Sequence, residues 1–334
     1  MPEPSLPSQR TRRGRLSRWS AGLVVLSAVA GYVVVQYDTG GTGGPGCEVV
    51  SGRGDGATYE FTPEQAVNAA TITAVGTARE LPERAVTIAL ATALQESALR
   101  NIDYGDRDSL GLFQQRPSQG WGTPKEIMDP AYAAEKFYEH LEEVPGYTRL
   151  PLTVAAQRVQ RSGFPQAYAK HEPDAALLAA ALTGRSAATL TCEGRPAATR
   201  AAGADAVRTA LARDFGRDAL EPAAAEVEAT PAPPVSAPAD SGVSDGRTVR
   251  LPVAAGEDAG AEADAGARGW QLAHWAVANA SELRIQRVSY AGREWTAGNT
   301  DSQWRPTDGG AEDDGKSAEG PGDGAGVVTI TTMP

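Results

Sequence analysis

The spacing of apolar residues over much of the chain has the period of an α-helix. One such stretch covers residues 62–79, where Thr62 is a suitable N-cap, Pro63 takes the first helical position and Gln65 completes a capping box. A second covers residues 82–99, and its apolar residues wrap more than one face, which predicts a central, buried helix. Further helices are expected over residues 129–142, 153–161, 173–182 and 199–215.

Alternation of apolar and polar residues, the sign of a half-buried strand, is confined to the C-terminal part. We find none of any length within residues 47–192, where residues 101–122 have the Gly, Asp, Ser and Pro of a loop with turns or short strands. This segment is therefore expected to be all-α or α-rich. The C-terminal pattern predicts strands over residues 248–253, 285–290 and 327–332 and a helix over residues 270–283. The expected fold class is mainly α, with a small α/β module at the C-terminal end.

An uncharged, mostly apolar run near the N-terminus predicts a membrane anchor. Residues 21–35 form this run, and the span from Trp19 to Tyr37 is 19 residues long, about what crosses a ~30 Å hydrocarbon core. Five arginines lie within residues 1–18, so the positive-inside rule keeps this basic tail in the cytoplasm and places the bulk of the chain outside the cell membrane. We expect a single-pass signal anchor over residues 19–37.

Two other interpretations of the apolar run stay open. Ala28-Val29-Ala30 has the form of a signal-peptide cleavage site, although cutting there would leave only a short hydrophobic region. A buried core helix is the other alternative, for which the charged and aromatic flanks are unsuitable.

The two cysteines, Cys47 and Cys192, both follow the predicted anchor and therefore lie where disulfides persist. A bridge between them would close a loop of roughly 145 residues, worth about 4–5 kcal/mol in the chain-entropy model. We take the bridge as marking a helical domain over residues 47–220, preceded by a Gly/Thr-rich stalk over residues 38–46.

Charge and metal-ligand residues narrow the function classes. The formal net charge of −11 argues against nucleic-acid binding, which needs a basic surface. His140, His171 and His274 are far apart, and no pair has zinc-site spacing, so neither a metal nor another cofactor is expected. A single apolar span without charge offers no solute path, which argues against a transporter.

The C-terminal third has two compositions. Residues 221–246 are rich in Pro, Ala and acidic residues and predict a disordered linker. Residues 247–334 have globular composition apart from an acidic, Gly-rich insert at 309–326, and the segments 269–280 and 285–295 resemble a small module at the ends of other actinobacterial exported proteins. The module's tryptophans are expected in its core, with a ligand-binding surface as the alternative: Trp270, Trp275, Trp295 and Trp304.

Glu96 is the candidate catalytic residue. It ends an apolar helix, where partial burial disfavours the carboxylate and raises the pKa, as a general acid that protonates a glycosidic oxygen requires. Gln95-Glu96-Ser97 followed by Gly111-Leu112-Phe113-Gln114 resembles the lytic transglycosylase pattern of the lysozyme-like superfamily. The resemblance implies a lysozyme-like domain in which Glu96 is the acid and Ser97 and Gln114 line the sugar site.

A closer resemblance covers residues 47–192. An actinobacterial, membrane-anchored, wall-associated group shares nearly all of residues 89–97 and 104–123. Lytic transglycosylases also carry a later Tyr-Asn-Ala-Gly motif, from which this chain departs: Gln160 takes the place of the Asn and Val159 that of the Tyr. Tyr168, some nine residues on, is the candidate for the missing hydroxyl.

Other residues of the expected sugar site come from the loop after Glu96. Gln115 follows Gln114, and Trp121 is placed either to stack on a sugar ring or to pack in the core. The candidates for a second carboxylate are Asp103, Asp106 and Asp108. If one of them activates water, the enzyme is an inverting hydrolase, whereas a transglycosylase needs no such partner; the alternative is that they cap turns.

Two functions are compatible with this pattern. In the first, a tethered muramidase or lytic transglycosylase cleaves the bond between N-acetylmuramic acid and N-acetylglucosamine in peptidoglycan, with Glu96 as general acid. In the second, the same groove holds peptidoglycan or a protein partner without cleaving it, as a scaffold of the cell envelope. The absence of a Ser-His-Asp or Cys-His arrangement disfavours a peptidase.

Overall fold

The computed structural model describes residues 46–161, 165–194, 203–217, 246–253, 259–298, 303–307 and 326–334. Residues 45–334 belong to one compact unit. The predicted anchor and stalk precede Gly46 and lie outside the described residues, as does the predicted linker except for its last residue. No helix within the described ranges has both the length and the apolar character needed to cross a bilayer.

The helices of the disulfide-closed segment match the expected pattern closely. They are α2 (Pro63–Ala78), α3 (Glu83–Ser97), α4 (Pro124–Ile127), α5 (Pro130–Glu142), α6 (Leu152–Gln160) and α7 (Glu172–Leu182), with short 3₁₀ turns at Pro117–Gln119 and Pro165–His171 and with α8 (Ala204–Phe215) following. The capping box is confirmed, since the Gln65 amide donates to Thr62 Oγ1 and the Thr62 amide to Gln65 Oε1. Helix α3 is the central helix: most of it is buried, and α2, α5, α6 and α7 pack around it.

Of the two forms expected for residues 47–192, the α-rich one is confirmed and the all-α one is wrong. Strands β1 (Cys47–Val50), β2 (Thr58–Phe61) and β3 (Leu190–Cys192) form an antiparallel sheet in the order β2-β1-β3. Each strand is only three or four residues long, too short to show a period of two against the neighbouring helices. The pairing places Cys47 opposite Cys192, and the predicted disulfide between them is confirmed.

The C-terminal part is a sheet with helices on one face. Its elements are β4 (Thr248–Pro252), α9 (Ala259–Ala278), α10 (Ala280–Leu283), β5 (Ile285–Tyr290), β6 (Arg293–Thr296), β7 (Arg305–Pro306) and β8 (Val327–Thr332). Among the described residues the strands are antiparallel neighbours in the order β4-β8-β5-β6-β7. The predicted strands at 285–290 and 327–332 are confirmed. The helix expected from residue 270 begins at Ala259, because Ala-rich sequence continues the helix without adding an apolar stripe.

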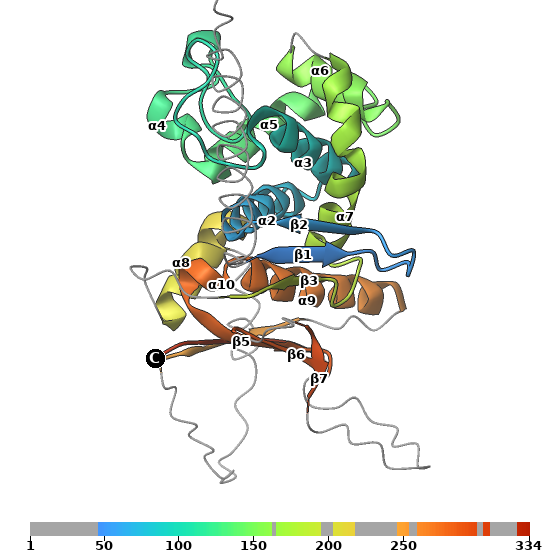
Figure 1. Ribbon diagram of the computed structural model, residues 1–334, viewed down its shortest axis with the longest axis vertical. Helices are drawn as coiled ribbons and strands as arrows, with labels where there is room; N and C mark the ends of the chain where they lie inside the picture. Colours follow the sequence, from blue (N-terminus) through green and yellow to red (C-terminus); the bar gives the residue numbers. More distant parts are fainter. Residues whose placement is uncertain are drawn as a thin grey trace, which may run out of the picture. The chain divides into compact units, whose positions relative to one another are not determined.

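Helix α9 lies between the two sheets (Figure 1). It contacts β5 and β8 on one side, and β3, α2 and α7 on the other. All four C-terminal tryptophans are at least nine-tenths buried, so the expected core role is confirmed. Two of them also reach the small sheet, because Trp295 Nε1 donates to Cys192 O at 3.1 Å and Trp304 Nε1 to Leu190 O at 2.9 Å. The C-terminal part therefore shares a core with the helical part.

Close backbone approach and a buried carboxylate stabilise this shared core. Gly184 has a φ of +77°, and a Cβ there would lie 1.8 Å from the carbonyl oxygen of Ala267 on α9, so only glycine fits. Asp214 on α8 is buried and accepts hydrogen bonds from Thr71 Oγ1 at 3.2 Å and Trp275 Nε1 at 2.8 Å. A single carboxylate thus joins α2, α8 and α9.

His274 on α9 is a further link between the two parts. Its ring is fully buried; Nδ1 lies 2.8 Å from the carbonyl oxygen of Ala181, and the amide of Thr189 donates to Nε2 at 3.3 Å. These partners assign the neutral tautomer with the proton on Nδ1. Burial lowers the pKa of His274 to about 4, although the hydrogen bond to Ala181 opposes the shift.

We predict that His274 makes folding stability fall between pH 6.5 and pH 4. Above pH 6.5 the ring is neutral in both the folded and unfolded states, and its full contribution is present. As the pH falls, the unfolded chain binds a proton that the folded ring, with its depressed pKa, does not bind. The loss is on the order of 3 kcal/mol, and urea titrations at several pH values measure it.

The matched control separates this effect from the titration of carboxylates. His274→Asn keeps a donor near the Nδ1 position but does not titrate, so its free energy of unfolding should depend less on pH than that of the wild type. His140→Asn, at an exposed position, should keep the wild-type slope. Equal slopes in all three proteins would contradict the assignment to His274.

Candidate active site

A cavity of about 1090 Å³ lies where the end of α3 meets the loop 101–122, the end of α5 and the last turn of α6. Figure 1 shows α6 and α4 on opposite sides of the α3–α5 pair. Of the residues expected at the site, the cavity wall includes Glu96, Gln114, Gln115, Trp121, Gln160 and Asp106. The fold therefore brings together residues that are up to 64 positions apart in the sequence.

Glu96 is half-buried at the last turn of α3. Tyr168 Oη donates a hydrogen bond to Glu96 Oε1 at 2.6 Å, and the side chain of Gln160 is a second hydrogen-bond partner. Burial raises the pKa of the Glu96 carboxyl above its ordinary value, and these two hydrogen bonds oppose the shift without cancelling it. Glu96 therefore holds its proton to a higher pH than a solvated glutamate does.

The partners of Glu96 come from segments far from α3 in sequence. Gln160 ends α6, and its Nε2 donates to the carbonyl oxygen of Phe113 at 2.6 Å, which holds it beside the Gly111–Gln114 turn. Tyr168 lies in the 3₁₀ turn before α7 and is fully buried. In the same turn, His171 Nε2 lies 3.2 Å from Gln95 Oε1. Tyr168 was the candidate for the missing tyrosine hydroxyl, and its hydroxyl indeed contacts Glu96. Val159, at the motif position of the tyrosine, is an apolar residue of the cavity wall.

Ser97 has a positioning role in this arrangement. Its side chain is buried and is absent from the cavity wall. The hydroxyl donates to the carbonyl oxygen of Leu112 at 2.7 Å, with that of Ala93 also near at 3.1 Å. Ser97 thus joins the end of α3 to the Gly-Leu-Phe-Gln turn and sets the distance between Glu96 and Gln114.

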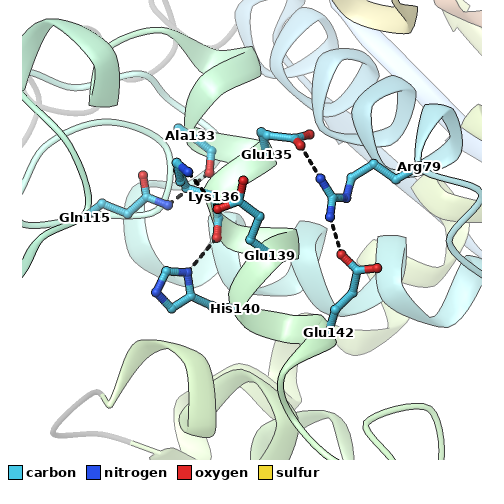
Figure 2. Close-up of polar contacts among 8 residues, drawn as sticks. All are labelled: Arg79, Gln115, Ala133, Glu135, Lys136, Glu139, His140 and Glu142. Atoms are coloured by element: carbon cyan, nitrogen blue, oxygen red, sulfur yellow. Dashed lines mark hydrogen bonds and ion pairs between the residues drawn. The ribbon is translucent and has the colours of Figure 1, made fainter.

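The turn that carries Gln114 contains a left-handed backbone position, which is occupied by Gly111. Gly111 has a φ of +74°, and a Cβ there would lie 2.7 Å from the carbonyl oxygen of Ile127. Gln114 has a positive φ of +49° and donates from Nε2 to the carbonyl oxygens of Gly111 and Tyr104. Gln115 is buried in the wall, and its Nε2 donates to Ala133 O at 3.0 Å (Figure 2). Within the described ranges, Gln115 Oε1 has no hydrogen-bond partner.

The three candidate second carboxylates have different surroundings. Asp108 accepts from Arg116 Nε at 2.9 Å and from the Ser118 amide at 2.8 Å. The hydrogen bond from the Ser118 side chain, followed by those from Arg116 and the Ser118 amide, holds the pKa of Asp108 well below its ordinary value. Asp108 thus caps a turn, which is the alternative given for these aspartates. Asp103 and Asp106 are both exposed, and of these two only Asp106 belongs to the cavity wall.

Trp121 and His140 form a stacked pair at the cavity. Their ring centroids are 4.2 Å apart at an interplanar angle of 27°. His140 Nδ1 lies 2.9 Å from the carbonyl oxygen of Lys136, and this contact holds the ring against the last turns of α5 (Figure 2). Arg79, the C-cap of α2, forms ion pairs with Glu135 and Glu142 of α5 and holds the two helices together (Figure 2).

The comparisons with known proteins concern the C-terminal part. Residues 238–317 match the protein-family model described as VldE, C-terminal domain. The matched segment contains α9, β5 and β6 but none of the residues of the cavity wall. The search of curated proteins found no match to the chain. The match thus covers residues that pack against β3 and gives no information on the function of the cavity. That function has to be inferred from the residues of the cavity wall.

Several cavity residues were missed from the sequence: His140, Glu143, Arg158 and Arg161. His140 was considered in the sequence as a possible metal ligand and not as a residue of the sugar site. Arg158 and Arg161 lie on either side of Gln160, whose position in the motif was recognised. This proximity in sequence is the signal that could have identified them. No group of three or more His, Cys, Asp or Glu side chains is placed to hold a metal in the described part of the chain.

Proposed function

We propose that this protein is a membrane-tethered, lysozyme-like protein that cleaves the glycan strands of peptidoglycan with Glu96 as general acid. One observation carries the proposal: a half-buried carboxyl with a raised pKa lies in the wall of a large cavity, with Tyr168 and Gln160 as its partners. A general acid needs a carboxyl whose pKa is above its ordinary value and which also reaches the substrate; the pKa of Glu96 is raised, and Glu96 lies in the cavity wall. The predicted anchor over residues 19–37 would keep this cavity on the outer side of the membrane.

The hydrogen bonds of Glu96 indicate how it would act. Because Tyr168 donates to Oε1, the transferable proton belongs on Oε2. Transfer of that proton to the glycosidic oxygen between N-acetylmuramic acid and N-acetylglucosamine breaks the bond as positive charge develops on the sugar ring. The resulting Glu96 carboxylate accepts hydrogen bonds from Tyr168 and Gln160, which stabilise its charge.

The fate of the sugar cation distinguishes two enzyme classes. In a hydrolase a second carboxylate activates water, and Asp106, which lies 3.9 Å from Arg107 Nε, is the one of the three candidates in the cavity wall. In a lytic transglycosylase a hydroxyl of the sugar itself closes an anhydro ring. The products therefore identify the class.

Binding without cleavage is a second candidate function, favoured by the same two hydrogen bonds. Tyr168 and Gln160 both donate to Glu96, and donors stabilise the carboxylate at the expense of the acid. A carboxylate held in this way is suited to accept hydrogen bonds from sugar hydroxyls. In that case the protein would be a peptidoglycan-binding scaffold of the envelope.

The test is incubation of the oxidised protein, residues 38–334, with peptidoglycan sacculi, followed by mass spectrometry of the soluble products. Anhydro-muropeptides indicate a transglycosylase and reducing-end muropeptides a hydrolase. Glu96→Gln should lower the rate by about 10²–10⁴-fold, the usual contribution of general acid catalysis. Asp103→Asn, which changes an exposed carboxylate outside the cavity wall, should retain the wild-type rate. If the protein pellets with sacculi and releases nothing, it is the binding protein.

A further inference from the structure

The last turn of α6 presents two arginines to the cavity. Arg158 and Arg161 are three residues apart, so they lie on one face of the helix end, and both are exposed members of the cavity wall. Neither forms an ion pair with any acidic side chain in the described part of the chain. Arg116 in the same wall differs, because it is paired with Asp108. The same wall also contains the carboxyls of Glu96, Asp106 and Glu143, but in the described part of the chain none of them forms an ion pair with Arg158 or Arg161.

Arg161 ends α6 in a backbone conformation that is more common for glycine. Arg161 is the C-cap of α6 and has left-handed dihedral angles, with φ +51° and ψ +37°. Glycine adopts this conformation without steric cost and is the common residue at such helix ends, whereas an arginine does so at a disadvantage. The same conformation occurs at the C-caps of α3 and α10, Ala98 and Arg284, so it is the place of Arg158 and Arg161 in the cavity wall that indicates a use for their side chains.

The position of the pair relative to Glu96 defines what it can contact. Gln160, which lies between the two arginines in sequence, is a hydrogen-bond partner of Glu96. Because Glu96, Arg158 and Arg161 all belong to the wall of one cavity, a glycan bound there with its glycosidic oxygen at Glu96 shares that cavity with both guanidinium groups. Guanidinium groups recognise carboxylates with paired, charge-assisted hydrogen bonds.

We propose that Arg158 and Arg161 form a carboxylate-recognition subsite that selects glycan strands carrying acidic substituents beside the bond at Glu96. This inference rests on the proposed function, because it assumes that the cavity holds a glycan. The ligand class is an anionic glycan whose sugars bear carboxylates directly or through attached peptides. Neutral glycans with the same backbone occupy the cavity without using the pair.

The test compares two ligands that differ only in charge. Soluble, uncross-linked peptidoglycan strands are used either unmodified or with their carboxylates converted to amides, and binding to the Glu96→Gln protein, residues 38–334, is measured by calorimetry. The unmodified strands should bind about tenfold more tightly than the amidated ones, and added salt should reduce this preference. R158A/R161A should lose the preference and still bind the amidated strands as before.

Two further variants control for charge and for folding. R250A/R293A removes two exposed arginines of the C-terminal sheet and should keep the full preference for the unmodified strands. Arg161→Gly relieves the left-handed position, so it should unfold at a temperature no lower than the wild type and still lose part of the preference. The subsite is overturned, while the proposed function stands, if R158A/R161A keeps the preference for the unmodified strands. The same holds if the protein with both arginines intact binds the two ligands equally. If neither ligand binds, the proposed function and the subsite fail together.

Discussion

Ending the chain after Arg217 is expected to leave the helical part unfolded, although that part contains the cavity and the disulfide. Helix α9 packs on α2, α7 and β3, and its removal uncovers side chains such as Phe215, which packs on Trp275. Each large apolar side chain uncovered costs about 1.5–3 kcal/mol. A handful of them therefore equals the whole stability of an ordinary domain, about 5–15 kcal/mol. Circular dichroism during heating measures the loss of the cooperative transition.

A cut within the predicted linker is the matched control for that truncation. A protease site placed among residues 221–246 leaves both pieces present, and the buried contacts of Trp275, Trp295 and Trp304 should hold them together. The cut protein should elute as one species and keep a cooperative unfolding transition. A chain ending at Arg217 that melts cooperatively within a few degrees of the longer protein would show that the helical part folds alone.

Removing the disulfide is expected to produce the second large effect on stability. The bridge joins residues 145 positions apart, and the chain-entropy model gives it about 5 kcal/mol through the conformational freedom it removes from the unfolded chain. C47A/C192A should therefore unfold at a much lower urea concentration than the oxidised wild type. Equilibrium urea titration with a fluorescence readout of the buried tryptophans measures the difference.

The reducing agent provides the internal control for this prediction. Dithiothreitol should shift the wild-type midpoint towards that of C47A/C192A and should leave the midpoint of the variant unchanged. The β1–β3 pairing and the hydrogen bond from Trp295 to Cys192 O do not depend on the bridge, so the reduced protein should fold to the same state in the absence of urea. An unchanged wild-type midpoint after complete reduction would rule out the entropic account.

The helices of this fold were largely predictable, since their ends carry local signals. Thr62 and Gln65 form the expected capping box, and the expected bounds of α3, α5, α6 and α7 differ from the observed ones by at most two residues. Helix α8 begins at Ala204, five residues after its expected start. The strands β1 and β3 were missed because they become strands only by pairing with each other across 145 positions. Nothing within three or four residues specifies such a pairing. The start of α9 was placed too late for a related reason, because its first turns lack large apolar residues.

The site was predictable as far as its motif reached. Glu96 and Gln114 lie near each other in sequence, and both are in the cavity wall. Tyr168 was suggested only as a replacement for a missing hydroxyl, and its contact with Glu96 depends on the packing of the 3₁₀ turn before α7. The stacking of Trp121 on His140 involves two segments that share no pattern. Such contacts follow from tertiary packing and have no signature in a single sequence.

The position of the disulfide at the beginning and end of the helical segment has a mechanical consequence. Cys47 is bonded directly to Cys192, so a pulling force between Gly46 and any residue after Cys192 passes through the sulfur–sulfur bond. Residues 48–191, which include Glu96 and the whole cavity wall, form a covalent bypass that carries no tension. A chain pulled at Gly46 and at a residue after Cys192 would therefore keep the geometry of its cavity under load for as long as the bond is intact.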